Sequence, residues 1–141
     1  MLRNDQIQAA LVAYLKSRTN ITTEVTHEVE GEDVIEIRED QWQGSDFSYP
    51  NIRVRLMPSE PFMAENCKYH RFGVAFQAFS QGESSLEVDR IAGIIGNELH
   101  ERQFSSNSIA FSLRVSSLIP ALRSDLYTWR SECVMQGIAS G

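Results

Sequence analysis

A strand that ends in a polar turn and is followed by an amphipathic helix occupies residues 69–99, and no other part of the sequence constrains the fold as much. Alternate residues of the strand are apolar and share one face: Phe72, Val74, Phe76 and Ala78. Ser84 and Glu87 have the spacing of a capping box and precede a helical apolar stripe formed by Val88, Ile91, Ile95 and Leu99. A strand and a helix in succession, each with one apolar face, predict an α+β core.

The length and charge of the chain limit the classes of protein to which it can belong. Its 141 residues, of which 42% are hydrophobic, suit a single domain over residues 1–141 with one core. A net charge of −6 argues against broad binding of nucleic acid, because phosphate-binding proteins usually carry the opposite charge. The first six residues lack the apolar segment of a signal peptide, and no apolar run approaches the roughly 18 residues of a membrane span. We therefore expect a soluble protein that is made in the cytosol and does not enter a membrane.

The first half of the chain is expected to form one helix and three strands. The helix has Asn4 or Asp5 as its cap, a polar exit at Thr19-Asn20, and an apolar stripe formed by Ile7, Ala10, Leu11, Tyr14 and Leu15. Strand-like alternation runs from Ile21 to Ile37 and is broken by a turn at residues 30–33, which predicts a hairpin. Residues 52–56 alternate again as a half-buried strand between two prolines. The segments 40–50 and 58–67 have no clear period and are interpreted as loops.

The second half is expected to close the sheet. Residues 109–115 alternate as a strand, 116–125 form a connector interrupted by Pro120, and 127–135 form a last strand. Residues 136–141 are expected to be a flexible tail. The sequence thus predicts one α+β domain, in which a helix is followed by β-strands, a second helix and two closing strands. Both helices are expected to pack on a mostly antiparallel sheet.

Residues that could carry catalysis or bind a metal are not grouped in the sequence. The three histidines, His27, His70 and His100, form none of the short spacings that zinc sites use, and no serine lies in a nucleophile-elbow motif. The two cysteines, Cys67 and Cys133, are far apart and are expected to be reduced thiols. We expect a protein that is not an enzyme and has no catalytic residue, metal site or cofactor.

An alternative is a small ligand-binding or hydrolytic α+β domain. Such a domain would use a pocket between a helix and the sheet. Tyr69, His70 and Glu98 are the polar residues that could serve it.

The predicted hairpin is strongly acidic, and the strands that follow it carry basic residues. This segregation favours a head-to-tail contact between identical subunits. The candidate subunit-interface residues are Glu28, Glu30, Glu32 and Glu36 on one side and Arg53, Arg55 and Arg71 on the other. The alternative is an acidic hairpin face that is simply solvated.

The two predicted loops contain large apolar residues. Trp42, Phe47 and Tyr49 lie in the first loop, and Phe62 and Met63 lie in the second. If these side chains are exposed, they are candidates for docking on a partner protein, because aromatic residues are enriched in interface hot spots. They could instead fold back as a small cluster of their own.

The order of these elements resembles that of the tail terminator proteins of tailed bacteriophages, which are also called tail completion or minor tail proteins. The resemblance covers most of the chain. It rests on the helix at Ala9–Leu15, the strand that begins at Tyr49-Pro50-Asn51-Ile52, the strand Phe72–Phe79, the helix Leu86–Leu99 and the closing strand at Tyr127-Thr128-Trp129. The acidic hairpin and its Trp42 loop depart from the family's pattern.

The resemblance implies a structural role without catalytic residues. Subunits of this family close into a ring, typically six-fold, that caps the tail tube, stops its polymerisation and joins the tail to the head connector. The implied partners are further copies of the chain, the tail tube protein and the head connector or neck proteins. Genomic DNA would pass through the lumen without specific binding. The implied location is the tail or neck of a virion, assembled in the host cytoplasm. Another neck or tail tube ring protein is the alternative within the same class.

Overall fold

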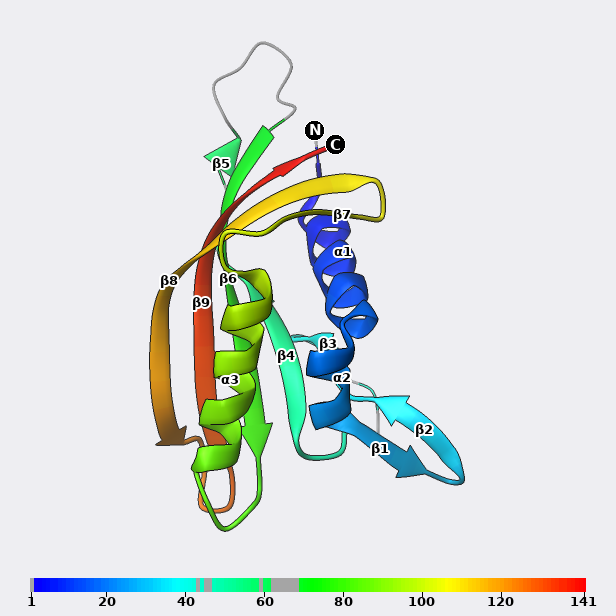
Figure 1. The fold of residues 1–141 in the computed structure, drawn as a ribbon, viewed down its shortest axis with the longest axis vertical. Helices are drawn as coiled ribbons and strands as arrows, with labels where there is room; N and C mark the ends of the chain where they lie inside the picture. Colours follow the sequence, from blue (N-terminus) through cyan, green and yellow to red (C-terminus); the bar gives the residue numbers. More distant parts are fainter. Residues whose placement is uncertain (1, 43, 45–46, 59, 62–68) are drawn as a thin grey trace.

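The computed structural model describes residues 2–42, 44, 47–58, 60–61 and 69–141. In the described part, three helices lie on one side of a long, curled sheet, and a two-stranded hairpin extends from one edge (Figure 1). The elements in chain order are α1 (Asn4–Ser17), α2 (Thr19–Val25), β1 (Thr26–Val29), β2 (Glu32–Ile35), β3 (Ile37–Glu39), β4 (Asn51–Leu56), β5 (Glu60–Pro61), β6 (Tyr69–Ser80), α3 (Leu86–Leu99), β7 (Gln103–Ser106), β8 (Ile109–Arg123) and β9 (Trp129–Ser140).

The main sheet has the strand order β3-β4-β6-β9-β8-β7, and β5 pairs with the first residues of β6. All of these pairs are antiparallel except β3 with β4. Strands β1 and β2 form a separate antiparallel pair. The single-domain α+β fold with helices on a mostly antiparallel sheet, predicted from the sequence, is therefore confirmed.

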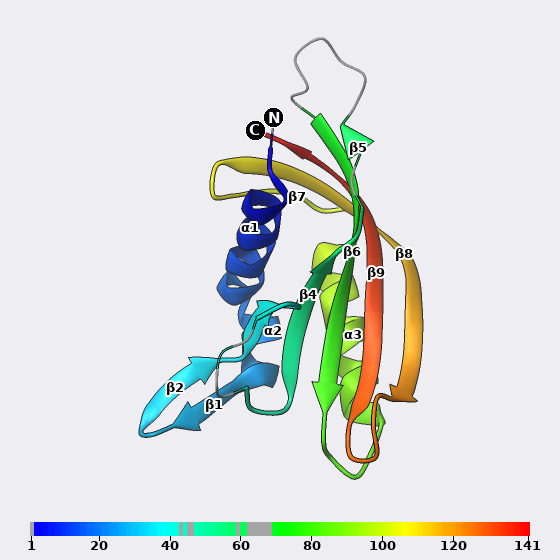
Figure 2. The ribbon, with the colours of Figure 1, turned by 180° about the vertical axis from the view of Figure 1, so that it is seen from behind.

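The core lies between the helices and the sheet face that they cover. The four predicted apolar residues of β6, from Phe72 to Ala78, are buried, and so are the four residues of the predicted stripe on α3. Seen from behind, the opposite face of the sheet carries no helix in the part of the chain that the structure describes (Figure 2). We call this second face the open face.

A short helix, α2, occupies residues that the sequence pattern assigns to a polar exit and a strand. Residues 21–25 are β-branched except for Glu24, and this composition favours a strand locally. Burial outweighs this preference, because Ile21 and Val25 lie one helical turn apart and are both fully buried. The caps also differ from the prediction. Helix α1 is preceded by Arg3, whose backbone N–H donates to Gln6 Oε1 at 2.9 Å.

The predicted capping box of α3 is replaced by a different pair of hydrogen bonds. Ser84 Oγ accepts from the backbone N–H of Leu86 at 3.2 Å. The Glu87 carboxylate accepts from Ser80 Oγ at 3.1 Å, which ties the helix to the end of β6. The predicted start of the helix is correct, although its capping geometry is not.

Strand β8 continues through the predicted connector to Arg123. Pro120 falls in a register irregularity between Ile119 and Leu122, where it has no partner in the ladder with β9. Strand β7 pairs only with the first four residues of β8, so the later part of β8 is an edge. A proline that lacks a backbone N–H is tolerated at such a position.

The expected flexible tail is instead part of the central strand β9, which continues to Ser140. Its last residues pair with β6 on one side and with β8 on the other. Gly137 and Ala139 are buried in the core face of the sheet. Small residues and Ser140 made this segment resemble a frayed end, but they allow close packing against Phe72 and Leu113.

Candidate interface surfaces

Arginine side chains gather on the open face of the sheet. Successive residues of a strand point to opposite faces, so the registers of β3, β4, β6, β9 and β8 decide which residues share a face. In these strands the open face carries one carboxylate, Glu132, and six of the chain's 13 lysines and arginines. We call this set the arginine face: Arg38, Arg53, Arg55, Arg71, Arg114 and Arg130.

The single carboxylate that these strands place on the open face does not neutralise the arginine face. Glu132 Oε1 accepts from Gln77 Nε2 at 2.5 Å and lies 3.9 Å from Arg130 Nε. Within the described residues, Arg38, Arg53, Arg55 and Arg114 form no ion pair. Arg38 Nε is buried and also lacks a hydrogen-bond partner. The positive charge of these four arginines is therefore held on this face without a counter-charge from the described part of the chain.

Two aromatic residues predicted to dock on a partner support these arginines. The Arg38 guanidinium lies 4.4 Å from the centre of the Trp42 ring, and the Arg53 guanidinium lies 4.7 Å from that of Phe47. The rings of Trp42 and Phe47 are 5.5 Å apart, and both residues are half-buried. They form a small cluster on the open face, the alternative that the sequence left open. Tyr49 is exposed, and Phe62 and Met63 lie outside the described residues.

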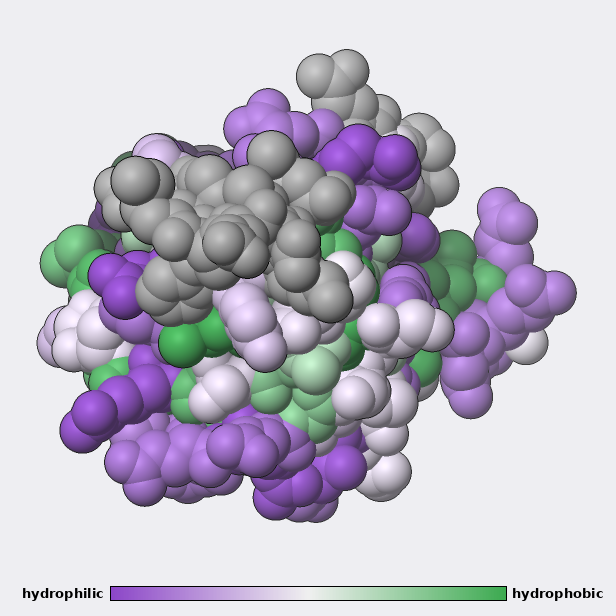
Figure 3. Space-filling view, turned by 90° about the horizontal axis from the view of Figure 1, so that it is seen from above, coloured by the Kyte–Doolittle hydropathy of each residue, from purple (hydrophilic) through white to green (hydrophobic). Residues whose placement is uncertain are grey.

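The acidic residues of the hairpin lie on an arm that leaves the body of the molecule. We call residues 26–35 the acidic arm; its turn places Glu30 and Gly31 at positive φ. The side chains of Glu28, Glu30, Glu32 and Asp33 are exposed. At the base, the backbone N–H of Glu36 donates to Val25 O at 2.9 Å, and His27 Nε2 lies 2.8 Å from Pro50 O. Seen from above, the arm extends beyond the body and is mostly hydrophilic (Figure 3).

Glu36 does not belong to the exposed part of this acidic set. Its side chain is 1% exposed, and its Oε2 has no hydrogen-bond partner. The reason is its backbone, which joins the base of the arm to the main sheet: the N–H binds Val25 O, and the carbonyl accepts from the N–H of Ile52. The structure therefore removes Glu36 from the residues that a second subunit could contact.

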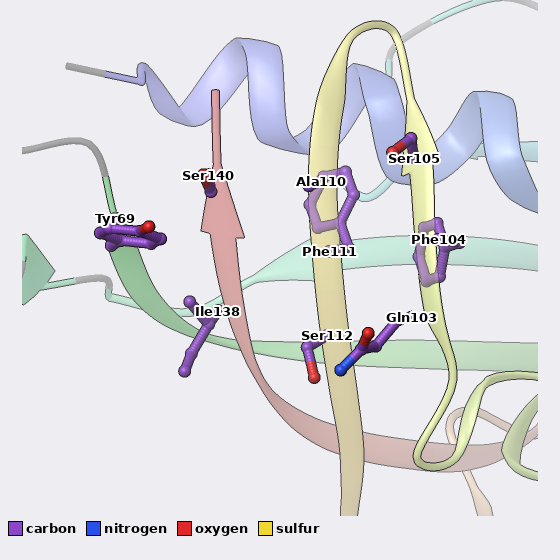
Figure 4. Close-up of a pocket in the computed structure, with 9 residues that line it drawn as sticks. All are labelled: Tyr69, Gln103, Phe104, Ser105, Ala110, Phe111, Ser112, Ile138 and Ser140. Atoms are coloured by element: carbon purple, nitrogen blue, oxygen red, sulfur yellow. The ribbon is translucent and has the colours of Figure 1, made fainter.

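The three residues of the alternative ligand site do not share a pocket. Tyr69 lies in an open-face groove of about 430 Å³ that is lined by β6, β7, β8 and β9 (Figure 4). His70 points to the opposite side of β6, where it is buried and neither ring nitrogen has a hydrogen-bond partner. Glu98 is on α3 and is bound by Asn20 and Arg18, and these contacts, the Asn20 bond first, lower its pKa. The arrangement offers no convergent set of acid and base groups.

The described residues include no group of three or more metal-binding side chains. Cys133 is buried, and burial raises the pKa of its thiol from 9.0 to about 12, so it is neither a nucleophile nor a ready metal ligand. Cys67 lies outside the described residues. No helix in the described ranges is both long and apolar enough to cross a bilayer.

Exposed apolar side chains occur at one end of the molecule, in the first turn of α3 and in the segment where β8 turns into β9; Figure 1 shows these two segments. The N–H of Ala121 donates to Asp89 Oδ1 at 2.9 Å and ties the two segments together. We call these residues the apolar end: Leu86, Leu122, Leu126 and Tyr127. Each of these side chains is more than half exposed, and Leu86 is 73% exposed.

The comparisons with known proteins give a fold relative but no family. No protein-family model and no curated protein matches the chain. A chain from the structure of the virion of a native gene transfer agent particle matches with a TM-score of 0.67 at 13% identity, over 96% of this chain and 95% of that one. The two chains share a fold. A second solved structure, of a protein without a functional name, matches with a TM-score of 0.61 at 14% identity, over 100% of this chain and 97% of that one.

Sequence reasoning found the arm and part of the arginine face, but it missed Arg38, Arg114 and Arg130 as members of the face. Their signal is present in the sequence, because each arginine alternates with apolar residues in a strand. The strand order was needed to place these three on the same surface as Arg53 and Arg55. The apolar end was also missed, because its residues come from two segments about 35 positions apart.

Proposed function

We propose that this chain is a structural protein of a phage or phage-like virion and acts as a tail terminator. Two independent observations support the proposal. The sequence resembles tail terminator proteins over most of its length, and the fold matches a chain of a gene transfer agent virion over nearly the whole of both chains.

The observation that carries the assembly role is the presence of two complementary surfaces on one subunit. The acidic arm and the arginine face carry opposite charges, and among the described residues no ion pair joins them within the chain. Different surfaces that complement each other generate a head-to-tail contact, which closes into a ring if the rotation between neighbours is suitable. A six-fold ring fits the resemblance.

In this role the protein works by geometry and not by catalysis. The ring caps the tail tube, stops its polymerisation and connects the tail to the neck proteins below the head, while DNA passes through the lumen. The exposed Tyr49 and the apolar end offer large apolar side chains for contacts with the tube or the connector. Assembly takes place in the host cytoplasm, and the finished protein remains in the virion.

Electron microscopy of particles that carry this chain tests the proposal. A ring of this fold at the head-proximal end of the tail supports it, as do overlong tubes or detached tails in particles that lack the chain. A ring in the neck with normal tail length when the chain is absent would assign it to the connector instead. Repetition of the fold along the whole tail would make it a tube protein.

A further inference from the structure

We infer that the arginine face of one subunit binds the acidic arm of a second copy of this chain. The inference deepens the proposed function, on which it rests for the closed ring, by naming the contact between neighbouring subunits. It adds Arg38, Arg114 and Arg130 to the basic side of that contact and removes Glu36 from the acidic side.

The arginine face is organised to receive carboxylates. Arg38 and Arg53 are held by aromatic rings, which restrict their side chains before any partner arrives. Arg55 and Arg114 are exposed, and they make no ion pair within the described part of the chain. Arginines that are already ordered lose less side-chain entropy when a carboxylate binds.

The acidic arm has the properties of an element that needs a partner. Its two strands pair only with each other among the described residues, and an isolated two-stranded hairpin is marginally stable in water. Its four exposed carboxylates, Glu28, Glu30, Glu32 and Asp33, form no ion pair in the described structure. Four-residue strands give the arm a reach of about 13 Å.

The acidic arm of a subunit extends sideways from the edge of the sheet and does not reach the arginines on the far strands of its own face. It leaves the molecule beside β4 and extends outward from that edge, whereas Arg114 and Arg130 lie across the sheet on β8 and β9 (Figure 2). The arm of a second copy is not attached to this sheet and can approach any part of the face. DNA is a weaker candidate, because the chain has a net charge of −6 and its acidic arm would repel phosphates.

A charge exchange between exposed residues tests the inference. One variant reverses the arm with Glu30→Lys and Glu32→Lys, and the other reverses the face with Arg55→Glu and Arg114→Glu. All four side chains are exposed, so both variants are expected to keep the thermal stability of the parent. Glu83→Lys and Arg102→Glu, at exposed sites away from both surfaces, serve as matched controls.

Sedimentation velocity at several salt concentrations provides the readout. Each variant alone should lose about tenfold or more in self-association, because like charges then face each other, whereas the controls should associate as the parent does. An equimolar mixture of the two variants should regain association, because the reversed arm of one variant then meets the reversed face of the other, and the unchanged arm meets the unchanged face. The two variants must alternate, so the rings should have an even number of subunits. A chain with all four changes should regain association by itself.

Several outcomes would overturn the inference. One is self-association that is unchanged by both charge reversals, and another is a pair of folded variants that do not associate when mixed. A third is a parent chain that stays monomeric even at ~1 mM, the limit of weak binding. Loss of double-stranded DNA binding in the face variant with unchanged self-association would assign the arginines to DNA. A ring seen on particles despite a failed charge exchange would leave the proposed function standing and remove only this contact.

Discussion

Arg38 and Arg53 lie opposite each other in the parallel register of β3 and β4, and each guanidinium stacks on an aromatic ring of the loop between these strands. Like charges at directly opposite positions of a sheet are normally destabilising. Here Trp42 and Phe47 face the two cations with their rings, and Arg53 also lies 5.5 Å from the ring of Phe79. The loop therefore maintains a concentration of positive charge that the sheet alone would disfavour.

Substitution of Trp42 tests whether its ring stabilises the Arg38 guanidinium or instead packs in an apolar cluster. Trp42→Ala should lower the free energy of unfolding by about 1–2 kcal/mol, the size of a partly desolvated cation–π contact. It should also weaken self-association, because Arg38 loses its support. Trp42→Phe keeps an aromatic face and should restore much of the association. Thermal melts and sedimentation velocity on the same samples measure both effects. A loss of about 3–5 kcal/mol without an association defect would instead place Trp42 in a packing cluster.

A pair of glycine substitutions tests the packing of the last strand. A Cβ at Gly137 would meet Phe72 Cζ at 2.9 Å and come closer still to Leu113 Cδ2. Gly137→Ala should therefore cost about 1–3 kcal/mol of stability through overpacking. A Cβ at Gly93, on α3, would meet no atom within 4 Å, so Gly93→Ala should stabilise the helix by up to about 1 kcal/mol. Urea unfolding measures both changes, and a Gly137→Ala variant as stable as the parent would contradict this account of β9.

Glu98 gives the protein a defined acid sensitivity. Its Oε1 accepts from Asn20 Nδ2 at 2.5 Å and its Oε2 lies 3.1 Å from Arg18, which joins α3 to the start of α2. These contacts lower its pKa from the usual 4.5, so the folded state favours the charged form. The resulting stability is present above pH 4.5 and is lost as the pH falls through the lowered pKa.

Glu98→Gln should reduce stability by about 1–2 kcal/mol at neutral pH, because a charged hydrogen-bond acceptor is replaced by a neutral one. The difference between parent and variant should shrink as the solution is made more acidic. Chemical unfolding at a series of pH values measures it. A difference that stayed constant down to pH 2 would show that the charge of Glu98 does not contribute.

The Cys133 thiol should be inert in the folded protein. Because burial raises its pKa from 9.0 to about 12, the thiolate fraction at pH 8 falls roughly a thousandfold below that of an exposed cysteine. In a Cys67→Ser background, alkylation by iodoacetamide at pH 8 should be slow until denaturant unfolds the chain. Rapid labelling of the native protein would contradict the described burial.

The parts of the fold that followed from the sequence are those in which local pattern and burial agree. The apolar side of the strand from Phe72 to Ala78 and the helical stripe from Val88 to Leu99 are confirmed, because the predicted apolar side chains of both elements are buried. The hairpin was recognisable from the polar run at residues 30–33, and the structure places its turn at Glu30-Gly31, the two residues at positive φ.

The errors occur where tertiary contacts outweigh local preference. Residues 19–25 favour a strand by composition, yet burial of Ile21 and Val25 makes them a helix. Pro120 suggests a connector only until the pairing shows that it lies in an irregular edge. The small residues after Met135 resemble a frayed end, but their lack of bulk suits a central strand between β6 and β8. No local pattern contains that information.

For the candidate surfaces too, the sequence pattern identified some residues, and tertiary structure was needed for the others. Charge segregation along the chain identified the acidic arm and Arg53, Arg55 and Arg71. Burial of Glu36 and the shared face of Arg114 and Arg130 depend on strand order, which the sequence pattern does not specify. For the aromatic residues of the first loop, the sequence left open whether they are exposed for docking or form a small cluster of their own. The positions of Arg38 and Arg53 against the rings of Trp42 and Phe47 were needed to answer this.

Imaging of tails with and without this protein tests the account most directly. Electron microscopy of assembled particles should place one ring of this fold at the head-proximal end of each tail. Particles deprived of the chain should have tubes that exceed the normal length and do not attach to heads. Tails of normal length joined to heads in the absence of the chain would contradict the account, as would complete particles of the parent in which no copy of the chain is found.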